Sequence, residues 1–417
     1  MPKLRVGVLF GGRSGEHEVS LLSAASVLKA IDPKKYEITP IGITKEGRWV
    51  TSSDATRLLA GQPASEPRAL RAGDPETTAS AAVLARGESV IVPPVPSESK
   101  TGALVPFETD AQSLDLHASA APTSTLSLDV IFPVLHGTFG EDGTIQGLFE
   151  LAGIAYVGSG VLGSATGMDK DIMKRLFAAV KLPITKHVSF LRSDWEASPK
   201  KTIAKIEAAL KYPLFVKPAN LGSSVGITKA HDRKELAPAI DIAAGYDRKI
   251  VVEQAVGGSA SRNRKKTGKA RELEVGILGN DNPQASVVGE IVPGKEFYDY
   301  EAKYLSEGSD LIIPAKLTKK QTREVQQMAI AAFRACDCSG LARVDFLMEP
   351  ISKSGPNAGK PGRIYLNEIN TMPGFTSISM YPKLWAASGI AYPELIDRLI
   401  ALALERRAEK DRTSYSR

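Results

Sequence analysis

The segment that most constrains the fold is the first one, a short apolar run that ends in two glycines. Leu4–Phe10 (LRVGVLF) runs into Gly11–Gly12, and apolar residues then recur at roughly helical spacing as far as Ile31. A buried strand, a glycine turn and a helix in this order open a parallel α/β sheet. Tyr36–Ile43 and Val130–Leu135 read as further strands of the same layer. The sequence therefore predicts an N-terminal domain built on an open parallel α/β sheet.

Between these strands lies an insertion at residues 51–125 that is rich in Ala, Ser, Pro and Gly. Ser89–Val92 is a short strand candidate within it. A long insertion is tolerated because loop-closure entropy costs only ~0.6 kcal/mol per doubling of length. We predict a surface insertion, after which a helix at Thr144–Ala152 resumes the pattern, and we place the N-terminal domain at residues 1–158.

Residues 159–253 have the size and pattern of a small α+β domain. We expect helices at Lys170–Val180 and Trp195–Leu210 and strands at Leu214–Lys217 and Ile250–Glu253. Strands and helices that alternate in so short a stretch predict a central subdomain.

Residues 254–417 form the third predicted part, which is richer in strands. The expected strands are Leu273–Leu278, Ala285–Ile291, Ala342–Met348 and Arg363–Ile369, and the expected helices are Lys319–Ala335 and Pro393–Leu404. The predicted fold class is therefore a multidomain chain that combines α/β and α+β parts.

Composition excludes several classes of protein. The 417 residues are 43% apolar and 24% charged, which is typical of a soluble chain of two or three domains. The net charge of +6 could indicate nucleic-acid binding, but neither a basic helix nor an aromatic platform for RNA accompanies it. An enzyme that handles anionic substrates is the favoured interpretation.

Cysteine spacing and hydropathy indicate the compartment. Cys336 and Cys338 lie one residue apart, so they neither staple distant segments nor complete a zinc site. Reduced cysteines suit the cytosol. The N-terminus lacks the long apolar region of a signal peptide, and no apolar stretch reaches the ~18 residues of a membrane span. We predict a cytoplasmic protein with no membrane and no nucleic-acid partner.

Two neighbouring strands carry a candidate metal site. Side chains alternate faces along a strand, so Arg343 shares a face with Asp345, and Glu368 shares one with Asn370. The polar segment 349–362 could join the two strands as an antiparallel pair. Two carboxylates and one amide oxygen suit a Mg²⁺ ion that bridges nucleotide phosphates. Taken alone, a solvated strand face explains these residues equally well.

Two glycine-containing segments could hold charged ligands. Lys217 leads from a strand into a loop, PANLGSSVG, whose N–H groups and hydroxyls could cradle phosphate, although an ordinary turn is an alternative and the Walker pattern is absent. Gly11–Ser20 (GGRSGEHEVS) permits a tight turn but lacks the third glycine of the dinucleotide fingerprint. Glu16 and Glu18 could there serve only as favourable charge at a helix N-terminus.

Two further segments have both a plain and a functional interpretation. Phe297–Tyr304 (FYDYEAKY) reads as an ordered loop, or as tyrosines covering apolar neighbours. Asn370–Ser379 (NTMPGFTSIS) follows the candidate metal strand directly. Its glycine could offer an N–H where negative charge develops, or it could simply belong to a capped helix start.

In this order the segments resemble the D-alanine–D-alanine ligase family of the ATP-grasp superfamily. The similar segments are GGRSGEHEVS, LHGTFGEDGTIQG, GSGVLGSATGMDK, KPANLGSSVG, FYDYEAKY, ARVDF and NEINTMPGFTSIS. The resemblance spans nearly the whole chain outside the 51–125 insertion, which is longer than the family pattern leads us to expect, and a second, basic insertion at Ser259–Ala270 also departs from it. It implies a two-domain ATP-grasp fold after the N-terminal sheet.

The resemblance also implies which residues bind the nucleotide. Lys170, Lys217 and Ser224 would contact phosphates, Glu253 would read the adenine amino group, and Glu272 would bind the ribose. The cations would be two Mg²⁺, or Mn²⁺, held by three residues: Asp345, Glu368 and Asn370.

The same resemblance implies the substrate contacts. Glu16 would bind the ammonium of the first D-alanine, with His136 nearby, and Glu16 would join Ser223 and Tyr304 in a trio that closes a loop. The second D-alanine would place its carboxylate at Lys303 and Ser379. The reaction's oxyanion would be stabilised by Arg343 and the Gly374 N–H.

The implied activity is ATP-dependent ligation of two D-alanines through an acyl phosphate, in peptidoglycan precursor synthesis, by a homodimer. Two alternatives are a D-alanine–D-lactate ligase and a nucleotide-binding regulatory module without catalysis. The complete set around Asp345, with Arg343, argues against the second. Lys303 and Tyr304 favour the dipeptide, because an ester-forming site must exclude an ammonium and no histidine follows Arg271.

Overall fold

The computed structural model describes most of the chain, and the described residues fall into two compact units. Unit 1 comprises Met1–Val161, Gly279–Asp281 and Met372–Arg417, and unit 2 comprises Leu162–Leu278 and Asn282–Thr371. The described residues are 2–51, 83–84, 88–96, 101–106, 126–222, 224–257, 269–292, 310–350 and 362–414.

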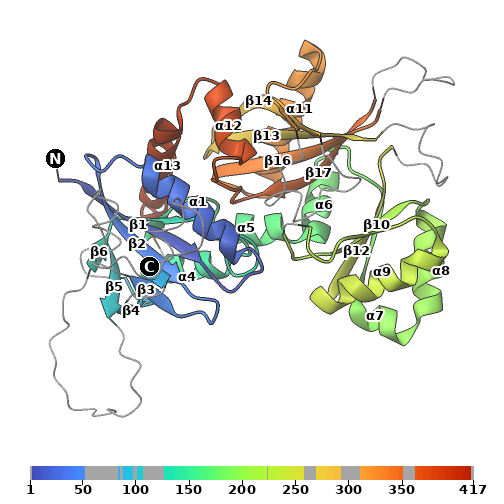
Figure 1. Cartoon of the computed structure of the whole chain (residues 1–417), viewed down its shortest axis with the longest axis horizontal. Helices are drawn as coiled ribbons and strands as arrows, with labels where there is room; N and C mark the ends of the chain where they lie inside the picture. The colour runs from blue at the N-terminus through green and yellow to red at the C-terminus, as the bar shows by residue number, and fades with distance from the viewer. Residues whose placement is uncertain are drawn as a thin grey trace, which may run out of the picture. The chain divides into compact units, whose positions relative to one another are not determined.

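Unit 1 is built on a single sheet of eight strands in the order β6-β5-β4-β3-β2-β1-β7-β8 (Figure 1). Strands β2, β1, β7 and β8 run parallel, which confirms the predicted parallel sheet, and β3 to β6 extend it in antiparallel fashion. The strands are β1 Leu4–Gly11, β2 Tyr36–Ile43, β3 Trp49–Thr51, β4 Glu88–Ile91, β5 Gly102–Pro106, β6 Leu126–Leu128, β7 Val130–Pro133 and β8 Ala155–Tyr156.

Two segments of the insertion belong to the sheet rather than to the surface. Strands β4 and β5 lie within residues 51–125, and their side chains Val90 and Leu104 are buried in the core. The prediction of a surface insertion is therefore wrong for these segments. Strand β4 agrees with the strand candidate Ser89–Val92 to within one residue, whereas β5 was not predicted from the sequence.

Helices connect the parallel strands of unit 1, and their arrangement sets the position of a crevice at one edge of the sheet. The helices of unit 1 are α1 His17–Ala30, α4 Thr144–Ala152, α12 Met380–Ala387 and α13 Tyr392–Lys410. Helix α1 connects β1 to β2, and α4 connects β7 to β8. Because the strand order is β2-β1-β7-β8, the two connections run in opposite directions away from the central pair β1 and β7. A reversal of this kind leaves a crevice at the carboxyl ends of the two central strands, where α/β proteins usually bind ligands.

The first lobe of unit 2 is a four-stranded antiparallel sheet in the order β11-β10-β12-β9. Its strands are β9 His187–Leu191, β10 Leu214–Pro218, β11 Thr228–Ala230 and β12 Lys249–Gln254, and its helices are α7 Arg192–Ala197, α8 Pro199–Ala209 and α9 Arg233–Tyr246.

The prediction of one helix at Trp195–Leu210 is wrong, because the segment forms α7 and α8. Ser198 has φ −156° and ψ 78° between them, and Pro199 occupies the first turn of α8. A proline disfavours helical geometry at the residue before it but suits the first helical position, so it ends one helix and starts the next.

The second lobe of unit 2 is a five-stranded sheet in the order β15-β14-β13-β16-β17. Phe177 of α6 and Phe333 of α11 pack with Val344 and Leu366 in its core. Its elements are α5 Val161–Met168, α6 Lys170–Ala179, β13 Arg271–Gly279, β14 Gln284–Val292, β15 Asp310–Ile312, α11 Lys319–Ala335, β16 Gly340–Met348 and β17 Ile364–Asn370.

The structure also bears on the predictions for the two cysteines and for membrane spans. Cys336 and Cys338 are free and buried. In the described part of the chain, every helix is too short or too polar to cross a bilayer. The division into three domains at residues 158 and 253 stays a prediction.

Candidate active site

The hairpin of β16 and β17 brings the candidate metal-binding residues together. Asp345 lies opposite Glu368, and Arg343 lies opposite Asn370. The Asn370 side-chain N–H donates to Asp345 Oδ2 at 3.0 Å. The prediction of an antiparallel pair is confirmed, while the connecting residues 351–361 lie outside the described part of the chain.

This donor set fits a hard divalent cation that arrives with a nucleotide. Among the described residues, no three His, Cys, Asp or Glu side chains gather as a metal site. Asp345 and Glu368 thus offer two carboxylates and Asn370 one neutral oxygen. Mg²⁺ usually keeps waters and phosphate oxygens alongside one or two protein carboxylates, so the remaining ligands need not come from the protein.

Arg343 is fixed beside this pair by two acidic residues. Its Nε and Nη2 donate to the two Asp345 carboxylate oxygens at 2.8 Å each, and Nε lies 3.1 Å from Glu274 Oε2. The guanidinium is planar and permanently charged, so a two-point pair of this kind sets its direction. A cation is therefore preorganised next to the candidate metal ligands.

Lys170 begins α6 and contacts both the glycine-serine loop and the hairpin. Its Nζ donates to the Leu221 carbonyl at 2.6 Å and lies 4.0 Å from Glu368 Oε2. The Asp169 side chain caps the helix by accepting from the N–H groups of Asp171 and Ile172. The cap fixes the start of the helix, and with it the direction of the lysine.

Glu253 is a buried carboxylate held between two lysines. Its oxygens lie 3.1 Å from Lys217 Nζ and 3.3 Å from Lys174 Nζ, and the Thr185 hydroxyl donates to Oε2 at 3.0 Å. Burial alone would raise the pKa of Glu253, but Lys174 and Lys217 outweigh it and lower the pKa to about 2. The group is thus an ionised hydrogen-bond acceptor inside the unit.

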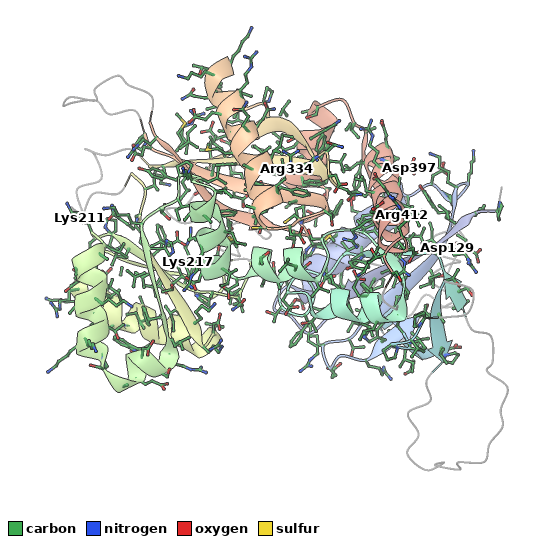
Figure 2. The ribbon with its side chains drawn as sticks, turned by 180° about the vertical axis from the view of Figure 1, so that it is seen from behind. Asp129, Lys211, Lys217, Arg334, Asp397 and Arg412 are labelled. Carbon is green, nitrogen blue, oxygen red and sulfur yellow. The ribbon has the colours of Figure 1, made fainter. Side chains whose placement is uncertain are left out.

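The loop that follows Lys217, which Figure 2 labels, contains two residues with left-handed backbone. Ser224 and Gly226 have φ of 61° and 71°, and a Cβ on Gly226 would come within 2.6 Å of the Tyr246 ring. Asn220 is anchored through its backbone and side-chain N–H groups to Asp247 Oδ2, at 2.8 and 3.1 Å. Turns of this type are common anion-binding backbones.

In unit 1, Glu16 is buried at the start of α1, against the loop that follows β7. Its side chain is 8% exposed and makes no capping hydrogen bond. A Cβ on Gly137 would lie 2.5 Å from Glu16 Oε2. The Ser14 hydroxyl donates to the His136 carbonyl at 2.7 Å and joins the same two segments. Glu16 is therefore buried against this loop, and its contact with the first substrate stays a prediction.

The His136 ring ties α1 to the segment after β17. Its Nδ1 lies 3.1 Å from the Met372 carbonyl and its Nε2 lies 3.0 Å from the Ser23 hydroxyl, which also accepts from the Phe375 N–H at 3.2 Å. A neutral ring that donates from Nδ1 and accepts at Nε2 satisfies all three groups. The expected place of His136 near the first substrate stays a prediction.

Gly374 and Ser379 lie close together before α12. The Ser379 hydroxyl accepts from the Thr376 N–H at 3.0 Å and lies 2.7 Å from the Thr376 hydroxyl. A Cβ on Gly374 would come within 2.8 Å of the Ser379 hydroxyl, so no larger residue fits without a shift.

Some of the expected site lies beyond what the structure describes. Ser223, Lys303 and Tyr304 lie outside the described residues, so the trio with Glu16 and the Lys303 contact stay predictions. Glu272 lies near the start of β13, opposite Ile291, and its ribose contact stays a prediction as well.

Lys174 and Glu274 are site residues that the sequence interpretation missed. Lys174 is 1% exposed, and its Nζ also donates to the Asn367 carbonyl of β17 at 3.1 Å. A lysine in a helix usually reads as solvent-facing. The available signal was its position four residues after Lys170, which places both on one face of α6.

An α/β sheet unit followed by two antiparallel α+β lobes, with a carboxylate hairpin on the second, defines the ATP-grasp class of ligases. Residues 5–159 match the family model for the D-ala D-ala ligase N-terminus, and residues 176–401 match the model for its C-terminus. The chain belongs to the D-alanine–D-alanine ligase family.

Individual relatives agree with this assignment. The D-alanine–D-alanine ligase of Bacillus cytotoxicus is 46% identical over 418 residues and covers 100% of both chains. The solved D-alanine–D-alanine ligase of Coxiella burnetii is 31% identical, has a TM-score of 0.74, and covers 99% of this chain and 97% of its own. The solved VanG D-Ala:D-Ser ligase of Enterococcus faecalis is 33% identical, also with a TM-score of 0.74, over 96% of this chain and 100% of its own.

Proposed function

We propose that the chain joins two D-alanine molecules into D-alanyl-D-alanine and converts ATP to ADP and phosphate, as a step in peptidoglycan precursor synthesis. The observation that carries the proposal is the hairpin register, with Asp345 opposite Glu368 and Lys170 beside Glu368. That arrangement supplies carboxylate ligands and a lysine cation in one place, as phosphoryl transfer from a nucleotide requires.

Unit 2 would bind ATP. Lys170, Lys217 and Ser224 are proposed to hold phosphate oxygens, and Glu272 the ribose. Glu253 is ionised and buried, so it can accept a hydrogen bond from an adenine amino group but would repel a carbonyl at the same position. We expect ATP to be preferred over GTP for this reason.

Asp345, Glu368 and Asn370 would hold two Mg²⁺ or Mn²⁺ ions. Bound there, the cations would neutralise phosphate charge during transfer. The protein's own contribution is to fix the direction of the three oxygens through the hairpin, and to keep the Arg343 guanidinium beside them.

The proposed reaction has two chemical steps. The carboxylate of the first D-alanine attacks the γ-phosphorus, ADP leaves, and an acyl phosphate forms. The deprotonated amine of the second D-alanine then attacks the carbonyl carbon, and phosphate leaves. Glu16 would bind the first ammonium near His136, Lys303 and Ser379 the second carboxylate, and Arg343 with the Gly374 N–H the oxyanion.

The proposal extends to the setting of the enzyme. From the family resemblance we propose a homodimer that works in the cytoplasm on small-molecule substrates, with the three-domain division at 158 and 253. The trio of Glu16, Ser223 and Tyr304 is proposed to close a loop and exclude water, which would otherwise hydrolyse the acyl phosphate.

The test is phosphate release by the purified full chain. We expect release that requires ATP, D-alanine and Mg²⁺ together, stops on addition of EDTA, and resumes with excess Mg²⁺ or Mn²⁺. Release that is independent of D-alanine would indicate a nucleotidase. An absence of release under all conditions would favour the regulatory module.

A further inference from the structure

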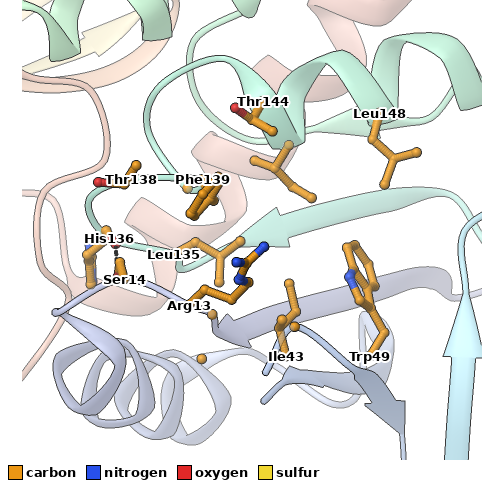
Figure 3. A pocket seen from close by; sticks show the side chains of 15 residues that line it. Arg13, Ser14, Ile43, Trp49, Leu135, His136, Thr138, Phe139, Thr144 and Leu148 are labelled. Carbon is orange, nitrogen blue, oxygen red and sulfur yellow. Dashed lines mark hydrogen bonds between the residues drawn. The ribbon is translucent and has the colours of Figure 1, made fainter. Parts of the chain in front are cut away.

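Unit 1 contains a cavity of about 220 Å³ whose lining includes His136 but not Glu16 (Figure 3). Its walls are mainly apolar, with Trp49, Leu135 and Leu148 among the lining side chains. The volume is below the ~300–1,000 Å³ of drug-sized sites, so an occupant would be a small molecule.

The position of the cavity is one at which α/β sheets bind ligands. It is bordered by the residues that follow β1, β2 and β7, including Gly12, Gly47 and Thr138. Strands β1 and β7 are the pair at which the strand order reverses. A crevice outside the carboxyl ends of such a pair is the usual ligand position in this architecture.

Arg13 gives the cavity one positive charge. Figure 3 shows its side chain directed toward the space between Leu135, Ile43 and Trp49. The guanidinium carbon lies 5.0 Å from the centre of the Phe139 ring. Within the described part of the chain, this guanidinium has no ion pair and no hydrogen bond. An anionic group could therefore approach it without breaking a described ion pair or hydrogen bond.

Phe139 supports a ligand-binding interpretation independently. It has φ 66°, a left-handed conformation that costs a bulky residue energy, and its side chain is 44% exposed at the cavity. Its N–H donates to Asp142 Oδ2 at 2.8 Å, which helps to hold the turn. A strained, exposed aromatic residue kept beside a cavity is a common feature of binding sites.

We propose that this cavity binds a small carboxylate carried on an aromatic or branched apolar body. The Arg13 guanidinium faces the carboxylate, while Trp49, Leu135 and Leu148 contact the body. The methyl group of D-alanine is too small to fill these apolar walls, so the proposed occupant is not D-alanine, although His136, which we place near the first substrate, borders the cavity.

Phenylacetate is the probe, and phenylacetamide is its neutral counterpart of equal shape. Binding to the full chain is measured by calorimetry or ligand-observed NMR. We expect phenylacetate to bind about five- to tenfold more tightly than phenylacetamide, because the charge pair is only partly withdrawn from water. Addition of D-alanine leaves phenylacetate bound.

Two variants and a matched control locate the site. Arg13→Gln removes the preference for the carboxylate, and Leu148→Trp fills the cavity and weakens both probes at least about tenfold. Arg48→Gln, which removes an exposed arginine that does not line the cavity, keeps wild-type binding. Arg13→Gln keeps D-alanine ligation within severalfold, so failure of this proposal is distinguishable from failure of the proposed function.

Three binding results would overturn the proposal, and so would a fourth that concerns the control variant. They are an absence of saturable phenylacetate binding up to about 10 mM, equal affinity for phenylacetate and phenylacetamide, and displacement of phenylacetate by D-alanine. Loss of binding in Arg48→Gln to the same degree as in Arg13→Gln would likewise contradict it. Thermal melting of each variant confirms that the fold is retained.

Discussion

The two units fix their functional side chains by different means. In unit 2, charged groups hold one another: Lys174 and Lys217 hold Glu253, and Asp345 holds Arg343. In unit 1, neutral hydrogen bonds hold the His136 ring, and a close contact with Gly137 limits the position of the Glu16 side chain. Paired charges suit a polyanionic ligand with cations, whereas fixed backbone suits a small substrate whose position must be exact.

The largest effect is expected in unit 2 at Glu368. Glu368→Gln removes one negative charge from the proposed metal ligands while keeping the shape of the side chain. We expect ligation to fall by at least about 10³-fold with no loss of thermal stability. Phosphate release at saturating Mg²⁺ is the measurement, and near-normal turnover would refute the metal assignment.

Arg343→Ala tests whether the preorganised guanidinium acts on the reaction itself. We expect kcat to fall about 10²–10³-fold, the usual cost of one oxyanion donor. Steady-state kinetics separate kcat from the KM for ATP. A change confined to the KM for ATP would make Arg343 a nucleotide contact, and Arg343→Lys serves as the variant that keeps the charge but loses the two-point pair.

Lys174→Met tests the charge-pair side of the comparison at a buried position. Among the described residues it leaves Lys217 as the lysine paired with Glu253, and loss of a buried partner costs about 3–5 kcal/mol of stability. We expect a lower melting temperature and a KM for ATP raised about tenfold. The double variant Lys174→Met with Glu253→Gln should regain part of the stability but not the KM. Additive losses of stability would show that the two residues are not coupled.

Gly137→Ala tests the backbone side of the comparison. Its φ of 73° and the 2.5 Å approach of a Cβ to Glu16 Oε2 mean that any side chain displaces the carboxylate. We expect the KM for the first D-alanine to rise about tenfold while the KM for ATP is unchanged. Gly147→Ala in α4 is the matched control, because a Cβ there meets nothing within 4 Å. Equal effects of both variants would contradict the proposed placement of Glu16.

The sequence predicted those elements whose signals are local. Helices α4 (Thr144–Ala152) and α11 (Lys319–Ala335) have the bounds that the sequence predicted. A capping box formed by Thr318 and Gln321 marks the start of α11. The short strands β9 and β11 and the helix α9 were missed. Helix α9 contains Pro238, which disfavours a helix interior, although Asp232 caps its start. The short strands β9 and β11 are stabilised by pairing with their neighbours in the first lobe, which a single sequence does not display.

The contacts of the candidate site likewise include some that the sequence predicted and some that only the structure reveals. The pairing of Asp345 with Glu368 follows from strand alternation and the loop between the strands, so the sequence predicted it. The inward direction of Lys174 and the contact of Glu16 with Gly137 depend on how distant segments pack. Such contacts carry no periodic signal, and the structure is needed to find them.

Product identity tests the central claim most directly. The purified chain is given ATP, Mg²⁺ and equal amounts of D-alanine, D-serine and D-lactate at pH 6 and at pH 8, and the products are resolved by mass. We predict mainly D-alanyl-D-alanine, with one ADP and one phosphate per dipeptide, because the proposed second-substrate segment 297–304 carries Lys303 to pair with the carboxylate and no second cation that would repel an ammonium. Predominant D-alanyl-D-lactate or D-alanyl-D-serine at both pH values would contradict the proposed specificity, and ATP consumption without any ligated product would contradict the proposed function.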